Sequence, residues 1–342
     1  MNIFLRTTQS FYHFFVQIRN YMYNHGLFRL REVSVPVVSV GNITFGGTGK
    51  TPTVIWMAQQ VRDKGFKVVV ISRGYKRRSI FTCVVSDTDK VRISRWRAGD
   101  EPYFMAHKLK GVPIIVSRKR INGAIKAVKK FKPDIILLDD GFQHRKMKRN
   151  IDIVLIDNPD IIHNNTLLRE PLKNLRRADI VMFTKYDQFE NAEEAHKQMV
   201  DRLSCPVFHS GYKLNGLCND SKELPPSALQ KKTVWLVAGI GNPKYFKHTV
   251  EQAGSYVSRT FFYHDHANYS RWRIRSIIRK FKGSSANYLI TTEKDWHKLK
   301  KWIPDDCPFY YLDIDVDINR SNLLMKLIYD TTYLQKVEDD VE

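Results

Sequence analysis

A glycine-rich loop that ends in Lys-Thr limits the folds open to this chain more than any other segment does. The loop runs from Gly41 to Thr51 and reads GNITFGGTGKT, after an apolar run at 35–40 and before a helix-compatible stretch. Glycines let main-chain N–H groups turn onto phosphate oxygens, and the start of a helix adds positive potential. The usual spacing would place the first glycine where this chain has Thr44, and an ordinary glycine-rich turn is the alternative. The flanking strand and helix favour a phosphate-binding loop, called the phosphate loop below.

The residue types of the phosphate loop predict its contacts with a nucleotide. The Lys50 side chain is long enough to reach the β and γ phosphates, and the Thr51 hydroxyl can ligate Mg²⁺. Main-chain N–H groups of the preceding residues would surround the phosphate oxygens. The predicted nucleotide-binding residues are therefore Gly46, Gly47, Thr48, Gly49, Lys50 and Thr51.

Two adjacent carboxylates follow a second apolar run. The run at 135–138 ends in Asp139 and Asp140. In a protein with a phosphate loop, acids at the carboxyl end of a strand lie beside the bound Mg²⁺. Asp140 is followed by Gly141, so Asp140 could instead be only a turn residue. We predict that Thr51, Asp139 and Asp140 hold the metal ion.

Apolar strand-like runs alternate with helix-compatible stretches through most of the chain. The runs in the first part lie at 35–40, 67–71, 112–116, 135–138, 151–156 and 178–183. This alternation predicts an α/β fold, a P-loop NTPase-like parallel sheet covered on both faces. Further runs at 233–238, 288–290 and 309–314 predict a second, smaller α/β domain.

The turn-rich composition between these two sets of runs predicts a linker, since glycines and a Pro-Pro pair gather there. An amphipathic segment at 323–334 is expected to close the second domain as a helix. The predicted parts are an N-terminal amphipathic membrane-associating segment at 1–32, a P-loop kinase domain at 33–205, a linker at 206–230, and a C-terminal α/β domain with its tail at 231–342.

The N-terminal segment has the periodicity of an amphipathic helix. Its apolar face carries Phe4, Phe11, Phe15, Ile18 and Met22, and its polar face carries Arg6, Ser10, His13, Gln17, Asn20 and Asn24. Basic residues together with aromatic ones are typical of a helix that lies on a membrane surface. The alternative is that the apolar stripe packs on the domain behind it. The sequence offers no spanning segment and no secretory cleavage site, so we expect membrane contact to be peripheral.

The charge balance of the chain favours anionic partners. The 342 residues include 56 Lys and Arg against 35 Asp and Glu, a formal net charge of +21. Such a field attracts nucleic acid, anionic membranes or phosphorylated substrates. The four cysteines are far apart and form no C-x-x-C pair, which argues against a zinc site or a disulfide framework and for a reducing compartment.

Several short motifs together resemble one family. They are GNITFGGTGKTP at 41–52, ISRGY at 71–75, GDEP at 99–102, DDGFQH at 139–144, LREPL at 168–172, AGIGNP at 238–243, DH at 265–266 and TTEKD at 291–295. In order and spacing they resemble the tetraacyldisaccharide 4'-kinases, the lipid A 4'-kinases. The resemblance implies phosphorylation by ATP of the 4'-hydroxyl of a tetraacylated disaccharide 1-phosphate, forming lipid IVA in lipid A biosynthesis. It also implies peripheral contact with the cytoplasmic face of the inner membrane of a Gram-negative cell. Lys76 stands where the family pattern commonly has another glycine.

The same resemblance implies roles for individual residues. Asp100 would accept the proton of the sugar hydroxyl, with His266 acting beside it. The alternatives are a helix N-cap for Asp100 and a solvated loop residue for His266. Arg169 would contact the ATP phosphates, or could form only a surface ion pair with its neighbour Glu170. Glu101 would help to hold Mg²⁺, or could simply favour the start of a helix.

Two other functions compete with the kinase. Thr184-Lys185-Tyr186-Asp187 follows a strand-like run and looks like the element that reads guanine in GTPases, so a P-loop GTPase is the alternative. The net charge would also suit a nucleic-acid-binding protein. The basic residues are spread over many segments, and no helix-turn-helix, zinc-finger or RNA-recognition signature accompanies them, so we expect no nucleic-acid partner.

Overall fold

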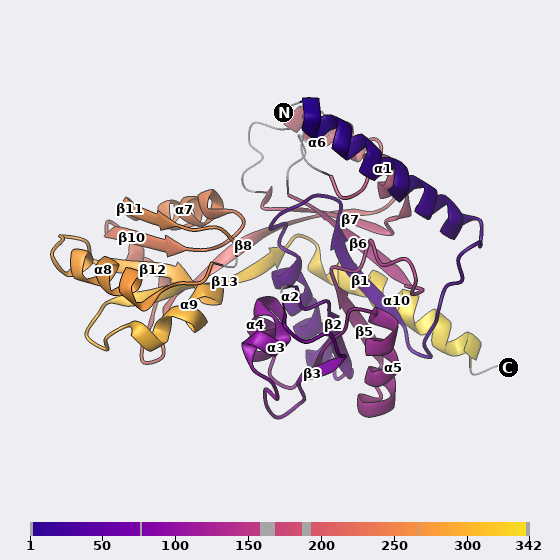
Figure 1. Ribbon diagram of the computed structural model, residues 1–342, viewed down its shortest axis with the longest axis horizontal. Helices are drawn as coiled ribbons and strands as arrows, with labels where there is room; N and C mark the ends of the chain where they lie inside the picture. Colours follow the sequence, from indigo (N-terminus) through magenta and orange to yellow (C-terminus); the bar gives the residue numbers. More distant parts are fainter. Residues whose placement is uncertain (1–2, 76, 158–167, 187–192, 266, 340–342) are drawn as a thin grey trace. The chain divides into compact units, whose positions relative to one another are not determined.

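The computed structural model describes residues 3–75, 77–157, 168–186, 193–265 and 267–339. The chain divides into two compact units. The first comprises Met1–Gly211 with Val316–Glu342, and the second comprises Tyr212–Asp315. Two long strands carry the chain out of the first unit and back, β8 (Val207–Cys218) and β13 (Phe309–Ile318) (Figure 1).

The first unit is built on a sheet with the strand order β8-β7-β6-β1-β5-β2-β4-β3. Its pairs are parallel except that β3 runs antiparallel to β4. The remaining strands are β1 (Val37–Asn42), β2 (Val68–Ser72), β3 (Cys83–Ser86), β4 (Ile114–Val116), β5 (Ile135–Asp139), β6 (Ile151–Ile156) and β7 (Ile180–Thr184). Each residue of β1, β2, β5 and β6 is buried, because helices cover both faces of the sheet.

Alternation along the strands decides which helix each side chain meets. The helices and 3-10 turns are α1 (Ile3–Asn24), α2 (Lys50–Asp63), α3 (Arg95–Ala98), α4 (Asp100–Lys108), α5 (Arg120–Phe131), η2 (Leu172–Arg177), α6 (Glu193–Val200) and α10 (Ser321–Asp339). Val38 and Leu137 join a core with α2, α4 and α10. Val37 and Ile136 point to the other face and join a core with α5. This period of two is what a doubly covered parallel sheet requires.

The second unit is also built on parallel strands. Its strands are β10 (Thr233–Ala238), β11 (Tyr256–Phe262) and β12 (Tyr288–Thr292), and they pair in the order β11-β10-β12-β13. The short β9 (Glu223–Leu224) runs antiparallel to β8. Apolar side chains of α8 (Arg271–Lys282) and α9 (Glu293–Leu299) join one core cluster, and those of α7 (Pro243–Gln252) join another. Two 3-10 turns complete the unit, η4 (Pro226–Leu229) and η5 (Lys300–Trp302).

The predicted α/β class is confirmed, and the predicted boundaries differ from the observed units. Residues 206–230, expected as a linker, form β8, β9 and η4 and contribute Leu217 and Leu229 to the core of the second unit. The segment at 323–334 is helical, but it packs in the first unit through Leu324 and Ile328. An amphipathic stripe predicts that a helix is buried but not against which sheet, which is why the sequence misplaced α10.

α1 lies along one side of the first unit (Figure 1). Its polar-face residues His13 and Asn20 contact Leu168 and Glu170 of the same unit. Phe11 and Phe15 are 66% and 65% exposed, and Ile18 is 40% exposed. The alternative that this stripe packs on the domain is therefore wrong for these three residues. The side chains of Phe4, Arg6 and Ser10 lie outside those that the structure describes. Across the described residues, no helix is both long enough and apolar enough to cross a membrane.

Candidate active site

The phosphate loop connects β1 to the first turn of α2. Gly46 and Gly49 have φ of 121° and 83°, and Gly49 is the N-cap of α2. Side chains other than glycine are strained in this region, so these glycines permit the tight turn. The Thr53 N–H donates to the Gly49 carbonyl oxygen over 3.1 Å and starts the helix. Lys50 and Thr51 are the first two residues of α2, where the helix N-terminus favours anions.

Two residues at the end of β7 form side-chain hydrogen bonds to the main chain of the phosphate loop. The Thr184 hydroxyl donates to the Thr48 carbonyl oxygen at 3.0 Å, and Lys185 Nζ donates to the Gly47 carbonyl oxygen at 2.7 Å. Both side chains are buried. Lys185 Nζ also lies 3.2 Å from the Asp157 carboxylate, which balances its charge. The sequence suggested that this element reads a base, but in the structure its first two residues support the loop.

Asp139 is the last residue of β5, the strand beside β1, and it is buried. The Ser72 hydroxyl donates to its Oδ2 over 2.7 Å, and its Oδ1 has no hydrogen-bond partner among the described residues. Burial raises the pKa of Asp139 to about 7, with added repulsion from Glu101 and Asp140. A buried carboxylate oxygen with no donor, close to two further acids, fits a divalent cation ligand.

Asp140 lies between two cationic side chains. Arg169 Nη1 is 2.8 Å and 3.0 Å from the two carboxylate oxygens, and Lys50 Nζ is 3.6 Å from Oδ1. Burial acts to raise the pKa of Asp140, but Lys50, Arg169 and Arg120 outweigh it and the pKa lies below the ordinary value. Asp140 has a φ of 56°, so its main chain turns sharply after β5. Asp140 is therefore more than a turn residue, because it joins the lysine of the loop to Arg169.

Arg120 is a residue of the site that the sequence analysis did not single out. It is buried at the start of α5, and its Nη2 lies 3.4 Å and 3.2 Å from the carbonyl oxygens of Asp139 and Asp140. Burial lowers the pKa of its guanidinium to about 10. No spacing signal distinguishes one buried arginine from its exposed neighbours Arg118 and Lys119, so sequence reasoning missed it.

Arg169 is held to the phosphate loop by its main chain as well. Its N–H donates to the Ile43 carbonyl oxygen over 2.6 Å, and its guanidinium lies 5.4 Å from the centre of the Phe45 ring. The carboxylate that Arg169 contacts is Asp140, and Glu170 instead binds Arg177. The alternative, a surface ion pair between Arg169 and Glu170, is therefore wrong.

Asp100 and Glu101 start α4, behind Gly99. Gly99 is the N-cap, with a φ of 94°, so Asp100 is the first helical residue and not the cap. A Cβ atom at Gly99 would lie 3.0 Å from the Tyr75 carbonyl oxygen, so the 71–75 and 99–102 motifs pack main chain to main chain. Asp100 Oδ1 lies 3.8 Å from Arg95 Nη1.

The other predicted catalytic residue cannot be placed in the same way. His266 lies outside the described residues. Its neighbour Asp265 has its Oδ1 3.2 Å from Lys294 Nζ in the second unit. In the first unit, the predicted residues Lys50, Asp139, Asp140 and Arg169 lie around the phosphate loop and the end of β5.

A sequence profile of the tetraacyldisaccharide-1-P 4'-kinases matches residues 1–332. This chain belongs to that family. A tetraacyldisaccharide 4'-kinase of Aquifex aeolicus is 34% identical over 324 residues, which cover 93% of this chain and 95% of that protein. One from Chlorobium chlorochromatii is 36% identical over 332 residues, 92% of this chain and 89% of that protein.

A solved structure agrees with the sequence comparisons. The structure of Aquifex aeolicus LpxK in complex with ATP matches with a TM-score of 0.77 and 33% identity, over 96% of this chain and 98% of that one. Membership of the tetraacyldisaccharide 4'-kinase family over nearly the whole chain supports the kinase and not the GTPase alternative. The hydrogen bonds from Thr184 and Lys185 to the phosphate loop are consistent with this conclusion, because they give the element a role other than reading guanine. Asp187, the last residue of that element, lies outside the described residues.

Proposed function

We propose that this chain transfers the γ-phosphate of ATP to the 4'-hydroxyl of a tetraacylated disaccharide 1-phosphate. The observation that carries the proposal is the grouping of Lys50, Asp139, Asp140 and Arg169 at one end of a parallel sheet, in a chain of the tetraacyldisaccharide 4'-kinase family. Phosphoryl transfer needs positioning and charge stabilisation more than covalent help from the protein. Two cations and a set of acids around a phosphate loop supply both.

Lys50 and Arg169 are the groups that would bind the transferred phosphate. Both contact Asp140, so this carboxylate holds their positive charges near the loop. Phosphate oxygens form two-point contacts with guanidinium groups and strong contacts with ammonium groups. Because the cations are already gathered, little reorganisation accompanies nucleotide binding.

Acidic and hydroxyl side chains at the same place would hold Mg²⁺. The candidates are Thr51, Asp139, Asp140 and Glu101, and the Asp139 Oδ1 atom that has no donor among the described residues fits such a role. Bound Mg²⁺ would neutralise charge on the β and γ phosphate oxygens.

Asp100 is the proposed acceptor of the proton of the sugar hydroxyl, and His266 is proposed to act with it in catalysis. At the start of α4 the carboxylate lies at the positive end of the helix. A loose transition state asks little of a base, so orienting the hydroxyl toward the phosphate accounts for most of the role.

The substrate would reach the site from a membrane surface. We propose that α1 lies on the cytoplasmic face of the inner membrane of a Gram-negative bacterium, as a peripheral contact. In support, Phe11, Phe14 and Phe15 are exposed on α1, and its polar face binds the first unit. An anionic lipid substrate is also consistent with the net charge of +21.

The experiment is transfer of labelled γ-phosphate from Mg-ATP to tetraacyldisaccharide 1-phosphate in detergent micelles. GTP in place of ATP and a sample without lipid serve as parallel controls. We expect label in the lipid only with ATP and lipid together. Hydrolysis of nucleotide without labelled lipid, above all hydrolysis of GTP, would contradict the proposal.

A further inference from the structure

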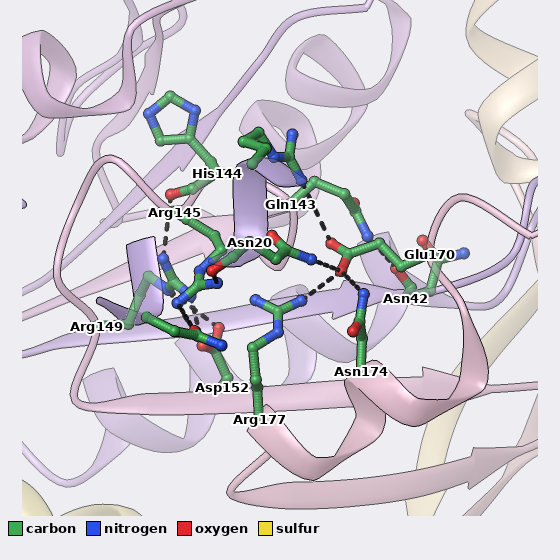
Figure 2. Close-up of polar contacts among 12 residues, drawn as sticks. Asn20, Asn42, Gln143, His144, Arg145, Arg149, Asp152, Glu170, Asn174 and Arg177 are labelled. Carbon is green, nitrogen blue, oxygen red and sulfur yellow. Dashed lines mark hydrogen bonds and ion pairs between the residues drawn. The ribbon is translucent and has the colours of Figure 1, made fainter. Parts of the chain in front are cut away.

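A fully buried carboxylate, Glu170, joins α1 to the segment that carries Arg169. Its Oε2 accepts hydrogen bonds from Asn20 at 3.0 Å, Asn174 at 2.7 Å and Arg177 at 2.6 Å. Figure 2 shows these three donors converging on the carboxylate from α1 and from η2. Asn20 is buried as well, at 5% exposed, so this contact is sealed from solvent. The other carboxylate oxygen, Oε1, has no hydrogen-bond donor among the described residues, so the three bonds to Oε2 carry the hydrogen bonding of this buried charge. Loss of one of these donors would leave the charge less compensated.

Further contacts from the polar face of α1 reach the same segment. His13 Nε2 lies 3.0 Å from the Leu168 carbonyl oxygen, and Arg19 Nη2 lies 3.8 Å from Glu170 Oε1. The helix thus holds both residues that flank Arg169 in the chain.

The 168–170 segment is tied to the phosphate loop on its other side. Leu168 forms an antiparallel bridge with Thr44, and the Arg169 N–H donates to the Ile43 carbonyl oxygen. Between these fixed points the Arg169 guanidinium reaches Asp140. One short stretch of main chain therefore has α1 on one side and the phosphate loop on the other.

We propose that Asn20 and Glu170 are positioning residues for Arg169, so that the docking of α1 sets the place of this guanidinium in the active site. The inference rests on the proposed function, because Arg169 matters only if it contacts the transferred phosphate. Asn20 and Glu170 act through the contacts that join α1 to the segment around Arg169. They hold the main chain from which Arg169 extends, and a shift of about 1 Å in a group that contacts a phosphate costs up to about 100-fold in rate.

The test is a double-mutant cycle on phosphate transfer to the lipid in micelles. Asn20→Ala should lower kcat/KM for ATP about tenfold in the wild-type background, and less than about twofold in an Arg169→Ala background. A residue that acts through Arg169 has nothing left to act on once the guanidinium is gone. Equal losses in the two backgrounds would overturn the proposal, and so would the absence of any loss from Asn20→Ala.

Matched variants separate positioning from folding. Gln17→Ala removes a contact of the same helix face with Lys173, on the exposed surface outside the 168–170 segment, and should leave kcat/KM unchanged. Glu170→Gln keeps an oxygen acceptor for Asn20, Asn174 and Arg177, so it should retain more activity than Glu170→Ala. If Asn20→Ala fails to fold in a thermal unfolding assay, the cycle is run with Glu170→Gln, and equal losses in its two backgrounds would again contradict the proposal. Absence of lipid phosphorylation by the wild type would refute the proposed function itself, whereas normal transfer without coupling refutes only the positioning role.

Discussion

Lys185 Nζ donates a hydrogen bond to the main-chain oxygen of Gly47, inside the phosphate loop, over 2.7 Å. Because Lys185 is buried and its charge is balanced by Asp157, the ammonium group is fixed behind the loop. A bond to a loop carbonyl stabilises the loop whichever base the nucleotide carries. This geometry distinguishes a loop support from a base-reading residue.

Lys185→Ala should weaken binding of ATP and of GTP by a similar factor. The substitution leaves the Gly47 oxygen and the Asp157 carboxylate without their donor, so the free energy of unfolding should fall by about 1–3 kcal/mol. Nucleotide titrations and urea unfolding measure the two effects. Lys129→Ala, at an exposed position of α5, is the matched control and should change neither. A loss confined to GTP would show that Lys185 reads the base after all.

Lys50→Ala should lower turnover by at least about 100-fold while the protein stays folded. The lysine is partly buried at the start of α2 and its ammonium group contacts Asp140 and Thr48, so its removal opens no apolar core. Labelled phosphate transfer gives the rate, and circular dichroism with thermal unfolding checks the fold. Lys64→Ala, at the exposed end of the same helix, should retain full activity. Near-normal turnover of Lys50→Ala would refute the assignment of the phosphate loop.

Much of the nucleotide site could be predicted because its signals are local. The glycines and the Lys-Thr pair at 41–51 predict the phosphate loop without reference to any other segment. Asp139 ends β5 and Asp140 follows it, and β5 pairs with β1, the strand that leads into the loop. Parallel strands bring their carboxyl ends to one edge, so the sheet itself joins these two motifs. The role of Arg169 beside them followed only from the resemblance to a family.

Other features depend on tertiary contacts that no spacing encodes. Glu170 looks like an ordinary surface acid until Asn20, 150 residues earlier in the chain, is packed onto it. Lys185 belongs to a motif that suggests another chemistry, and only the position of Gly47 shows what its side chain binds. Arg120 is one of three consecutive basic residues, and the sheet alone decides that it is the buried one.

The exposed aromatic face of α1 predicts a change in membrane binding without a change in fold. Phe11→Ser combined with Phe15→Ser should reduce sedimentation with anionic vesicles at least about tenfold, since both rings would lose burial in the lipid interface. The free energy of unfolding should change by less than about 0.5 kcal/mol, because both side chains are mostly exposed.

A control separates α1 from exposed aromatics in general. Phe81→Ser alters another exposed ring of the first unit and should leave vesicle binding unchanged. Unaltered sedimentation of the double variant would mean that α1 does not carry the membrane contact. Deletion of residues 1–24 is a poorer test, because it also removes Asn20 from Glu170.

Two histidines of the first unit, His196 on α6 and His209 on β8, face each other outside the candidate site. Their Nε2 atoms are 2.9 Å apart, a hydrogen bond in which one neutral ring donates and the other accepts. Burial lowers the pKa of His209 from 6.5 to about 4, and the nearby charges of His196 and Arg320 act in the same direction. Burial lowers the pKa of His196 too. The folded state therefore favours the neutral pair.

The histidine pair predicts a loss of stability on acidification. Between about pH 6.5 and pH 4 the unfolded chain takes up protons that folded His209 does not, so the free energy of unfolding falls as the pH falls through this window. His209→Gln keeps a polar side chain at this position that does not take up a proton. The free energy of unfolding of this variant should fall by roughly 1 kcal/mol less between pH 7.5 and pH 5 than that of the wild type. This value is small because solvent screens a half-buried ring. Urea unfolding at the two pH values measures the difference. His25→Gln, at an exposed histidine after α1, is the control and should show the same loss of stability on acidification as the wild type. An unchanged loss of stability in the His209→Gln variant would show that the histidine pair does not cause it.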